Sequence, residues 1–463
     1  MATYKIPGVY IDEINPLPHS ITSLPTAIPA FIGYTQKAQL LQADDLKFIP
    51  KKISSLQDYE RCFGLPMLET GITVTLDTTL PANIKATVNI KNVAPYLVYY
   101  SLQLYFANGG GPCYIVSAGA YNVNPEIVAA DLEIGLDATA SVKEPTLLLF
   151  PDAINLPSAD QYYQLYNKAM LQCALLKNRF TIMDVWVDNN SATNPIALMR
   201  NYAFAPAEIL KYGATYYPAL ATTINYAYQD GLVIINAPGN TLINGTLARL
   251  KLTDNNLYKI AMNALNIERM ILPASCAVAG VYVQVDNARG VWKAPANVNI
   301  AATVKPTLSI TAREQESLNV DTATGRSINA IRSFTGRGTA IIWGARTLMG
   351  NDNEWRYISV RRFFNMVETS VKYGIEQLVF EPHDANTWTR AKAITENYLF
   401  QLWKDGALSG IKPTEAYYVK TGIGQTMTAQ DILEGRMIIE IGMAVFRPAE
   451  FIIIRIEQKM LQE

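Results

Sequence analysis

The chain has 463 residues and a mass of 51.2 kDa, and its 39 Lys and Arg residues almost balance its 40 Asp and Glu residues. Only 17% of the residues are charged, whereas 49% are hydrophobic. This composition excludes an intrinsically disordered chain, which needs low hydrophobicity and high charge, and it lacks the global basic excess of a nucleic-acid-binding protein. Because little net charge keeps copies of the chain apart, we expect them to associate.

The length predicts two or three domains with ample hydrophobic cores. The four cysteines are widely spaced and include no C-x-x-C pair, which indicates neither a zinc site nor a disulfide framework. The N-terminus has no basic region followed by an apolar run, and the uncharged stretch 271–285 is too short to span a bilayer. We therefore expect a soluble protein that is made in the cytoplasm and holds no metal.

The first 27 residues differ from the rest of the chain. Prolines punctuate this stretch, and proline favours extended backbone and also biases the preceding residue away from helix. Within it, Val9, Tyr10 and Ile11 form a short β pattern. Such a segment is either a loose tail, the reading slightly favoured by the sequence alone, or a strand donated to another sheet.

From residue 28 onward, short apolar strands alternate with helical patterns. The helix is predicted at 162–176, where apolar residues recur at spacings of three and four. Continuous apolar strands of this kind indicate a mostly parallel sheet that is buried on both faces. A segment around 66–95 is rich in Thr, Val and Ile and predicts a β-rich insertion. The predicted strands are 30–33, 113–116, 147–150, 181–187 and 232–235.

Positive charge is concentrated in residues 289–362, which contain eleven Lys and Arg residues against five Asp and Glu residues. Nine of the eleven are arginines, which favour planar, bidentate pairing with carboxylates. Two readings stay open here. The segment is either an ordinary solvated surface, or a basic face that matches an acidic partner or another copy of the chain.

The last hundred residues predict a compact α/β unit. A helical stripe covers 364–378, and a second helix is expected to be capped by Asn386 or Thr387 and to stop at Gly406. Strand patterns follow at 437–446 and at 451–456. Because residues 451–456 are apolar on both faces, this strand must lie centrally in a sheet or be given to a neighbour.

Catalytic motifs are missing from the sequence. The two histidines are His19, in the proline-rich stretch, and His383, in a turn, and each is read as a surface residue rather than a base. No H-E-x-x-H, G-x-S-x-G or P-loop pattern occurs. We therefore expect no catalytic residue, no metal and no cofactor, although an enzyme with an unmarked site stays open at this point.

The sequence contains distinctive blocks, among them residues 4–13, 29–33 and 276–298. Together with further blocks, they resemble the tail sheath proteins of contractile injection systems. The resemblance is greatest to the extracellular, phage-tail-like particles of the antifeeding-prophage and virulence-cassette type, and myovirus tail sheaths are more distant. The blocks extend over nearly the whole chain, and 276–298 is the most specific of them. They include residues 4–13, 29–33, 276–298, 333–348, 354–363, 403–410 and 448–452.

The resemblance implies an α/β fold with a parallel-sheet, subtilisin-like sheath domain at 28–350, which carries the β-rich insertion. An extended N-terminal arm at 1–27 would precede it, and a C-terminal α+β inner sheath domain at 351–463 would follow and end in a donated strand at 451–456. Because no histidine lies between residues 20 and 382, a Ser-His-Asp triad cannot form within the subtilisin-like domain. The family is similar in lacking hydrolase activity.

The resemblance also implies a function. Sheath subunits form a helical or stacked-ring homopolymer around an inner tube through shared β-strands, and contraction drives the tube through a target membrane. The expected partners are copies of the chain, the inner tube protein, and baseplate and tail terminator proteins, with no nucleic acid and no direct membrane insertion. The subunit would be made in the bacterial cytoplasm and belong to a particle that can be released. The alternatives are a myovirus virion tail sheath and, in third place, a soluble α/β enzyme.

Two sets of residues are expected to serve this assembly. The predicted inter-subunit arm residues are Val9, Tyr10, Ile11, Phe451, Ile452, Ile453 and Ile454. The candidate inter-subunit or tube contacts are Arg326, Arg332, Arg337, Arg346, Arg356 and Arg361.

Overall fold

The computed structural model describes residues 21–79, 84–122, 124–188, 193–451 and 453. The chain divides into two compact units. The larger unit contains the described residues of 25–366 and 447–463, and the smaller unit contains those of 1–24 and 367–446. Helix α10 (Ile358–Ile375) begins in the larger unit and ends in the smaller one. The sequence predicts a C-terminal domain from residue 351, and the division lies within α10.

A nine-stranded sheet forms the centre of the larger unit, in the order β13-β16-β15-β8-β7-β6-β1-β5-β2. The six strands from β15 to β5 are parallel, whereas β2, β16 and β13 are antiparallel to their neighbours. The predicted α/β class with a mostly parallel sheet is thus confirmed, and antiparallel edges make the sheet mixed. The strands are β1 (Pro29–Thr35), β2 (Lys51–Ile53), β5 (Cys113–Ala120), β6 (Leu147–Leu149), β7 (Phe180–Asp184), β8 (Gly213–Tyr217), β13 (Val298–Asn299), β15 (Asn329–Phe334) and β16 (Gly338–Ile342).

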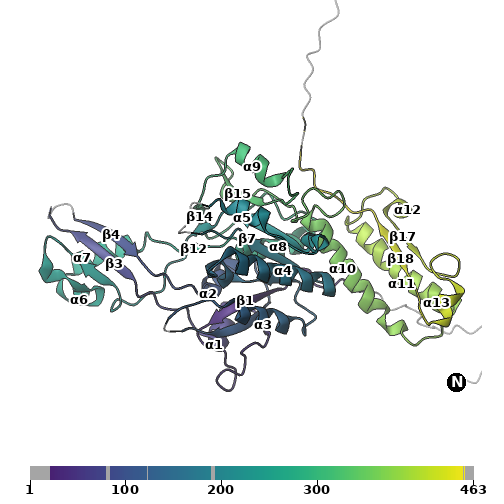
Figure 1. The fold of residues 1–463 in the computed structure, drawn as a ribbon, viewed down its shortest axis with the longest axis horizontal. Helices are drawn as coiled ribbons and strands as arrows, with labels where there is room; N and C mark the ends of the chain where they lie inside the picture. Colours follow the sequence, from purple (N-terminus) through teal and green to yellow (C-terminus); the bar gives the residue numbers. More distant parts are fainter. Residues whose placement is uncertain (1–20, 80–83, 123, 189–192, 452, 454–463) are drawn as a thin grey trace, which may run out of the picture. The chain divides into compact units, whose positions relative to one another are not determined.

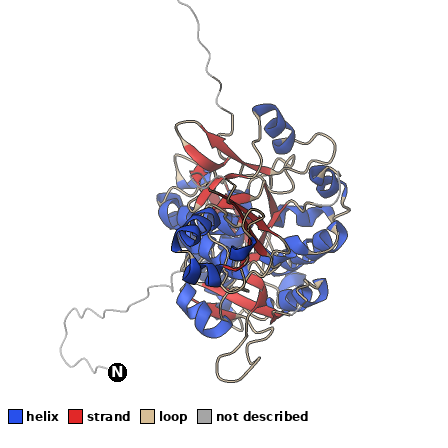
Figure 2. Ribbon diagram, turned by 90° about the vertical axis from the view of Figure 1, so that its left-hand side faces the viewer, coloured by secondary structure: helices blue, strands red, loops and turns tan. Residues whose placement is uncertain are grey.

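Helices cover both faces of this sheet (Figure 2). Along β1, Phe31 packs in the core on one face, whereas Ala30 and Ile32 pack in the core on the other. This alternation explains the continuous apolar strands, because both sets of side chains are removed from water. The first core includes residues of α1 (Leu56–Phe63), α2 (Val98–Ala107) and α8 (Ser275–Arg289), and the second includes residues of α3 (Ala129–Thr139) and α4 (Ala159–Leu176).

A second, four-stranded sheet in the order β11-β10-β3-β4 has a hydrophobic core of its own (Figure 1). The segment around 66–95 supplies the hairpin of β3 (Ile72–Asp77) and β4 (Lys85–Ile90). The sequence predicts that strand 232–235 belongs to the central sheet, and this prediction is wrong. Here β10 (Ile234–Asn236) pairs with β3, and Ile235 enters the core of the second sheet. The remaining elements are β11 (Gly245–Thr246), α6 (Leu247–Thr253) and α7 (Asn255–Leu265).

Shorter elements complete the larger unit. A three-stranded sheet has the order β12-β9-β14. Its strands are β9 (Leu220–Thr222), β12 (Ile271–Leu272) and β14 (Thr303–Pro306). The remaining helices are α5 (Pro195–Asn201) and α9 (Ala312–Asn319), with the 3-10 helices η1 (Pro151–Asn155), η2 (Ala207–Tyr212) and η3 (Thr241–Ile243).

The smaller unit contains the second half of α10, the long helix α11 and a two-stranded antiparallel sheet. The cap of α11 corrects one prediction, because the N-cap is Asp384 and not Asn386 or Thr387. The Asp384 side chain accepts the backbone N–H of Thr387 at 3.0 Å. Gly406, with a φ of 78°, follows the end of the helix as expected. The elements are η4 (Glu376–Leu378), α11 (Ala385–Lys404), α12 (Pro413–Ala416), β17 (Tyr417–Lys420), α13 (Ala429–Leu433) and β18 (Glu440–Met443).

Candidate functional site

Two buried carboxylates lie at the carboxyl edge of the parallel strands, where open α/β sheets usually bind ligands. Asp152 follows β6 and accepts hydrogen bonds from the backbone N–H groups of Tyr34 and Leu97, both at 2.6 Å. Asp184 ends β7 and accepts the N–H of Ser275 at 3.0 Å. Leu97 is the N-cap of α2 and Ser275 begins α8. Each carboxylate therefore fixes the start of a helix that packs on the sheet.

The titration of these groups does not suit nucleophilic catalysis. Burial raises the pKa of Asp152 to about 7 and that of Asp184 to about 6, against the opposing effect of their hydrogen-bond donors. Burial also raises the pKa of the neighbouring Cys276 to about 12, so this group is a thiol and not a thiolate at neutral pH. Of the two histidines, His19 lies outside the described residues, and His383 is half-buried in the smaller unit, with its ring 5.6 Å from that of Trp388.

The part of the chain that the structure describes lacks two features that would indicate other functions. No group of three or more His, Cys, Asp or Glu residues comes together there as a metal site. In the same residues, no helix combines the length and the apolar character that a membrane crossing requires.

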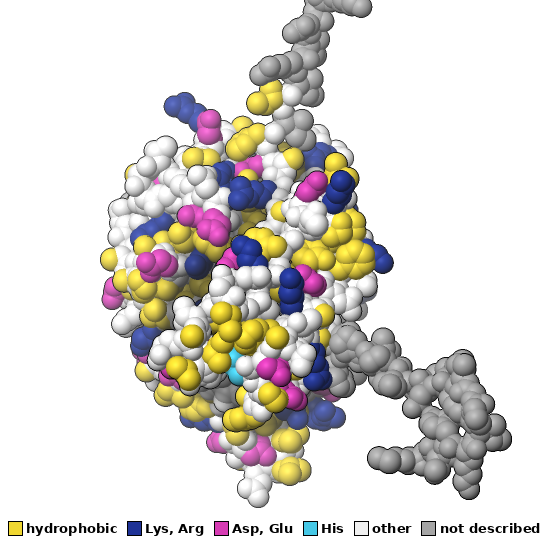
Figure 3. Space-filling view, turned by 90° about the vertical axis from the view of Figure 1, so that its right-hand side faces the viewer, with side chains coloured by type: hydrophobic (Ala, Val, Ile, Leu, Met, Phe, Trp, Pro, Cys, Tyr) yellow, Lys and Arg dark blue, Asp and Glu magenta, His cyan; other side chains and the backbone are white. Residues whose placement is uncertain are grey.

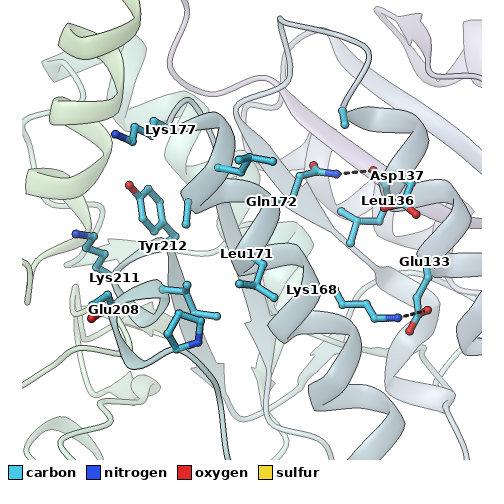
Figure 4. A pocket seen from close by; sticks show the side chains of 15 residues that line it. Glu133, Leu136, Asp137, Lys168, Leu171, Gln172, Lys177, Glu208, Lys211 and Tyr212 are labelled. Atoms are coloured by element: carbon cyan, nitrogen blue, oxygen red, sulfur yellow. Dashed lines mark hydrogen bonds and ion pairs between the residues drawn. The ribbon is translucent and has the colours of Figure 1, made fainter.

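A groove of about 900 Å³ lies along α4, between α3 and η2 (Figure 4). The side chain of Leu171 projects into it from α4, and Lys168 forms an ion pair with Glu133 of α3 across it. Gln172 donates a hydrogen bond to the carbonyl of Leu136 at 2.8 Å. The mixed apolar and charged lining resembles a protein-contact surface more than an enclosed small-molecule site, which is usually apolar with few polar groups.

Glu450, near the C-terminal end of the described residues, is held in the larger unit by several hydrogen bonds. Glu450 accepts a bidentate pair of hydrogen bonds from Arg346, from Nε at 3.0 Å and from Nη2 at 2.6 Å. Asn319 and Tyr357 donate to the same carboxylate at 2.7 and 3.2 Å. Burial alone would raise the pKa of Glu450, but its interactions with Arg346, Asn319 and Tyr357 together outweigh burial and lower the pKa, which favours the ionised group. The next residue, Phe451, is exposed.

The N-terminal end of the larger unit is held in a similar way. Thr26 donates its hydroxyl to Asp286 of α8 at 2.5 Å, and its carbonyl accepts hydrogen bonds from Arg362 at 3.0 Å and from Thr146 at 2.9 Å. Arg362 and Asp286 form an ion pair that is almost completely buried, with 2% and 5% of their side chains exposed. Both ends of the larger unit are thus fixed by an arginine of the basic segment.

The structure shows what each of the six candidate contact arginines touches within the chain. The guanidinium of Arg361 is buried, bonds to Asn365 at 2.8 Å and lies 4.5 Å from the ring of Trp355, and Arg346 is buried against Glu450. Arg337 is exposed and lies over Trp343, at 4.9 Å.

The other three candidates are half-buried. Arg326 donates to the carbonyl of Arg200, Arg332 to Gln315 and Arg356 to the carbonyl of Asp352, at 2.5, 2.6 and 2.8 Å. An inter-subunit or tube-facing role of all six stays a prediction. Of them, exposed Arg337 leaves the most guanidinium surface for a partner.

Most of the predicted arm residues lie outside the described residues. These are Val9, Tyr10, Ile11, Ile452 and Ile454. Phe451 and Ile453 are described, belong to no strand of their own chain and are 70% and 80% exposed.

The smaller unit offers a two-stranded sheet, and the strand predicted at 437–446 contains its strand β18, whereas its pairing with β17 was not predicted. Among the described residues, β17 and β18 pair as strands only with each other. A groove of about 670 Å³ lies beside β18, lined by alternate residues Met437, Ile439 and Ile441 and by Ile375 of α10. In Figure 3, yellow hydrophobic side chains surround the cyan histidine, His383, which also lines this groove. The strand pattern predicted at 437–446 was the available signal for this edge.

Comparison with known proteins identifies the family. Residues 350–459 match the family model described as the phage tail sheath C-terminal domain. The chain is 30% identical to a chain of the anti-feeding prophage helical sheath in its contracted state, over 99% of this chain and 100% of that chain, with a TM-score of 0.64. The chain belongs to the contractile tail sheath family.

The chain is also similar to other sheath proteins. This sheath protein is 29% identical to a chain of the PVC sheath complex of an extracellular contractile injection system in the contracted state, over 99% of each chain, with a TM-score of 0.64. It is 26% identical over 204 residues to the tail sheath protein of Enterobacteria phage T4, a match that spans 38% of this chain and only 30% of the T4 protein. The sequence-based recognition of the family is confirmed.

Proposed function

We propose that this sheath protein polymerises around an inner tube as a helical or stacked-ring assembly, and that contraction of the assembly drives the tube through a target membrane. The observation that most supports the proposal is the nearly full-length match to the contracted anti-feeding prophage helical sheath. The proposed partners are copies of the chain, the inner tube protein, and baseplate and terminator proteins. We propose further that the larger unit is subtilisin-like in fold only and catalyses no reaction.

The free edge of β18 is the proposed acceptor of a strand from a neighbouring subunit. Residues 451–456 would supply that strand, because they are apolar on both faces and lie at the C-terminal end. A strand added to a sheet edge gains backbone hydrogen bonds, and its alternate side chains fill adjacent pockets. The groove beside β18, with its Met437, Ile439 and Ile441 lining, offers such pockets. The proline-rich residues 1–27 would form the second link in the same manner.

The strength of one link follows from its backbone hydrogen bonds. A donated strand of about six residues makes about six such bonds at roughly 1 kcal/mol net each, which is a few kcal/mol per link. One link is therefore modest. Repeated links would keep subunits joined while their larger units move between two registers during contraction.

Truncation tests this proposal directly. The purified full chain should form striated hollow tubes in electron micrographs, whereas variants lacking residues 1–20 or 451–463 should stay monomeric. Both variants should keep the thermal unfolding transition of the full chain, because the groups deleted lie outside the described cores. Long, normal tubes from either variant would refute the strand links. Uniform small particles with enzymatic turnover from the full chain would favour an enzyme.

A myovirus virion tail sheath is the alternative assembly, and the partial match to the T4 protein supports this alternative. The nearly full-length likeness to a sheath from an extracellular contractile injection system favours a released particle. The two are separated by the genes beside this one, because a virion tail requires capsid genes and a released injection particle does not.

A further inference from the structure

We propose that residues 346–362, here called the tie segment, join the two terminal links mechanically, so that tension on the C-terminal segment bypasses the smaller unit. The inference rests on the proposed function, in which the terminal segments carry the links between subunits. It gives the arginine-rich stretch a role that the sequence did not reveal.

The chain order makes a bypass necessary. The chain passes from the larger unit into the smaller one within α10 and returns to the larger unit at residue 447. Without an anchor, a pull on the C-terminal segment would act first on β18 and the rest of 367–446. Glu450 is the anchor, because its carboxylate accepts hydrogen bonds from Arg346, Asn319 and Tyr357 of the larger unit.

The receiving side of this anchor is rigid. Arg346 and Tyr357 face each other in an antiparallel bridge, and Thr347 donates to the carbonyl of Arg356 at 2.8 Å. Glu450 therefore bonds to both sides of one hairpin. The planar guanidinium of Arg346 takes the carboxylate in a bidentate geometry that fixes its direction as well as its position. Being only 4% exposed, the Arg346 side chain is also shielded from salt.

The same segment then reaches the N-terminal link. Directly after the hairpin, α10 begins at Ile358 and carries Arg362, whose guanidinium bonds to the carbonyl of Thr26 and to Asp286. Thr26 also donates to Asp286, so both its backbone and its side chain are held just before β1. The route from Glu450 to Thr26 thus consists of one hairpin and the first turns of one helix.

The inference is tested by pulling on single molecules of the full chain between an attachment at Pro25, the first residue of the larger unit, and the C-terminus, because residues 21–24 belong to the smaller unit. In the wild type, the smaller unit should unfold only after the anchor breaks. Its roughly 80 residues then add about 270 Å of chain. In Glu450→Gln, this step should occur at a force at least twofold lower and with no preceding rupture, while the step of the larger unit keeps its force. Arg346→Lys, which keeps the charge but loses the bidentate pair, should lie between the two.

The control is Glu144→Gln, which removes the same charge from an exposed pair with Lys52 and should leave the trace unchanged. Traces of Glu450→Gln identical to those of the wild type would overturn the inference, as would an equal change in the control. If Glu450→Gln or Arg346→Lys lowers the force of every unfolding step to the same extent, the anchor is only a general stabiliser and the inference is also overturned. Because pulling needs no polymer, a failure of the full chain to form tubes would refute the proposed function separately.

Discussion

Asp152 allows a direct test of whether the carboxyl edge of the sheet serves the fold. Its side chain is completely buried, and both its oxygens accept backbone N–H groups. Burial raises its pKa to about 7, whereas an aspartate in an unfolded chain has a pKa of about 3.9. Between these values, the folded protein holds a proton that the unfolded chain has released. The contribution of Asp152 to the free energy of unfolding is therefore greatest at low pH and falls as the pH rises toward 7.

The size of this effect follows from the two pKa values. One unit corresponds to 1.36 kcal/mol, so between pH 5 and 8 the titration of Asp152 lowers the free energy of unfolding by roughly 2–3 kcal/mol. Asp152→Asn has no such proton and should lose this dependence. Asp184→Asn should remove roughly half as much over the same range, because the pKa of Asp184 is raised only to about 6.

Urea unfolding of the full chain at several pH values, followed by tryptophan fluorescence, measures these differences. The quantity to compare is the free energy of unfolding of the wild type minus that of each variant, which cancels all other titrating groups. It should fall with pH for both variants, and more steeply for Asp152→Asn. A difference that stays constant from pH 5 to 8 would show that the carboxylates remain ionised, and the reasoning would be refuted.

Two further predictions concern packing and buried charge. In Gly280→Ala, the new Cβ would lie 2.5 Å from the carbonyl oxygen of Tyr105 in α2, so the free energy of unfolding should fall by about 1–3 kcal/mol in urea. Gly231→Ala meets nothing within 4 Å and should stay within about 0.5 kcal/mol, and equal effects would contradict the close packing of α8 on α2. Asp286→Asn leaves the buried charge of Arg362 unpaired and should lower the free energy of unfolding by about 3–5 kcal/mol, measured by chemical denaturation. An exposed pair contributes at most about 1 kcal/mol, and a loss that small would contradict burial of the pair.

The strands of the central sheet were predictable because each strand is visible in its local sequence. In β1, β5, β6 and β7 every residue or nearly every residue is buried, which leaves an uninterrupted apolar run in the sequence. However, an apolar run does not show which strand it pairs with. Residues 232–235 look the same, and β10 nevertheless pairs with β3 in the second sheet. Pairing partners depend on the tertiary fold, which local patterns do not encode.

The arginines show the same limit at the candidate site. The sequence reveals an excess of arginine in 289–362, but the carboxylate that meets Arg346 lies 104 residues further along the chain. Composition predicts a need for carboxylate partners and leaves open whether they lie in the same subunit. For Arg346 and Arg362 the structure supplies them within the subunit, as Glu450 and Asp286.

The hydrogen-bonded carboxylates at the carboxyl edge and the anchored ends suit a single mechanical design. A carboxylate that acts on a substrate needs an oxygen that is free to contact it. Here Asp152 and Asp184 instead hold the starts of α2 and α8, which makes the sheet and its helices one stiff body. A stiff body transmits force without absorbing it, provided that the force enters at defined points. Glu450 and Thr26 are such points, and both are fixed by buried arginines. Among the described residues, β17 and β18 pair as strands only with each other, so their outer edges are the proposed contacts for another chain.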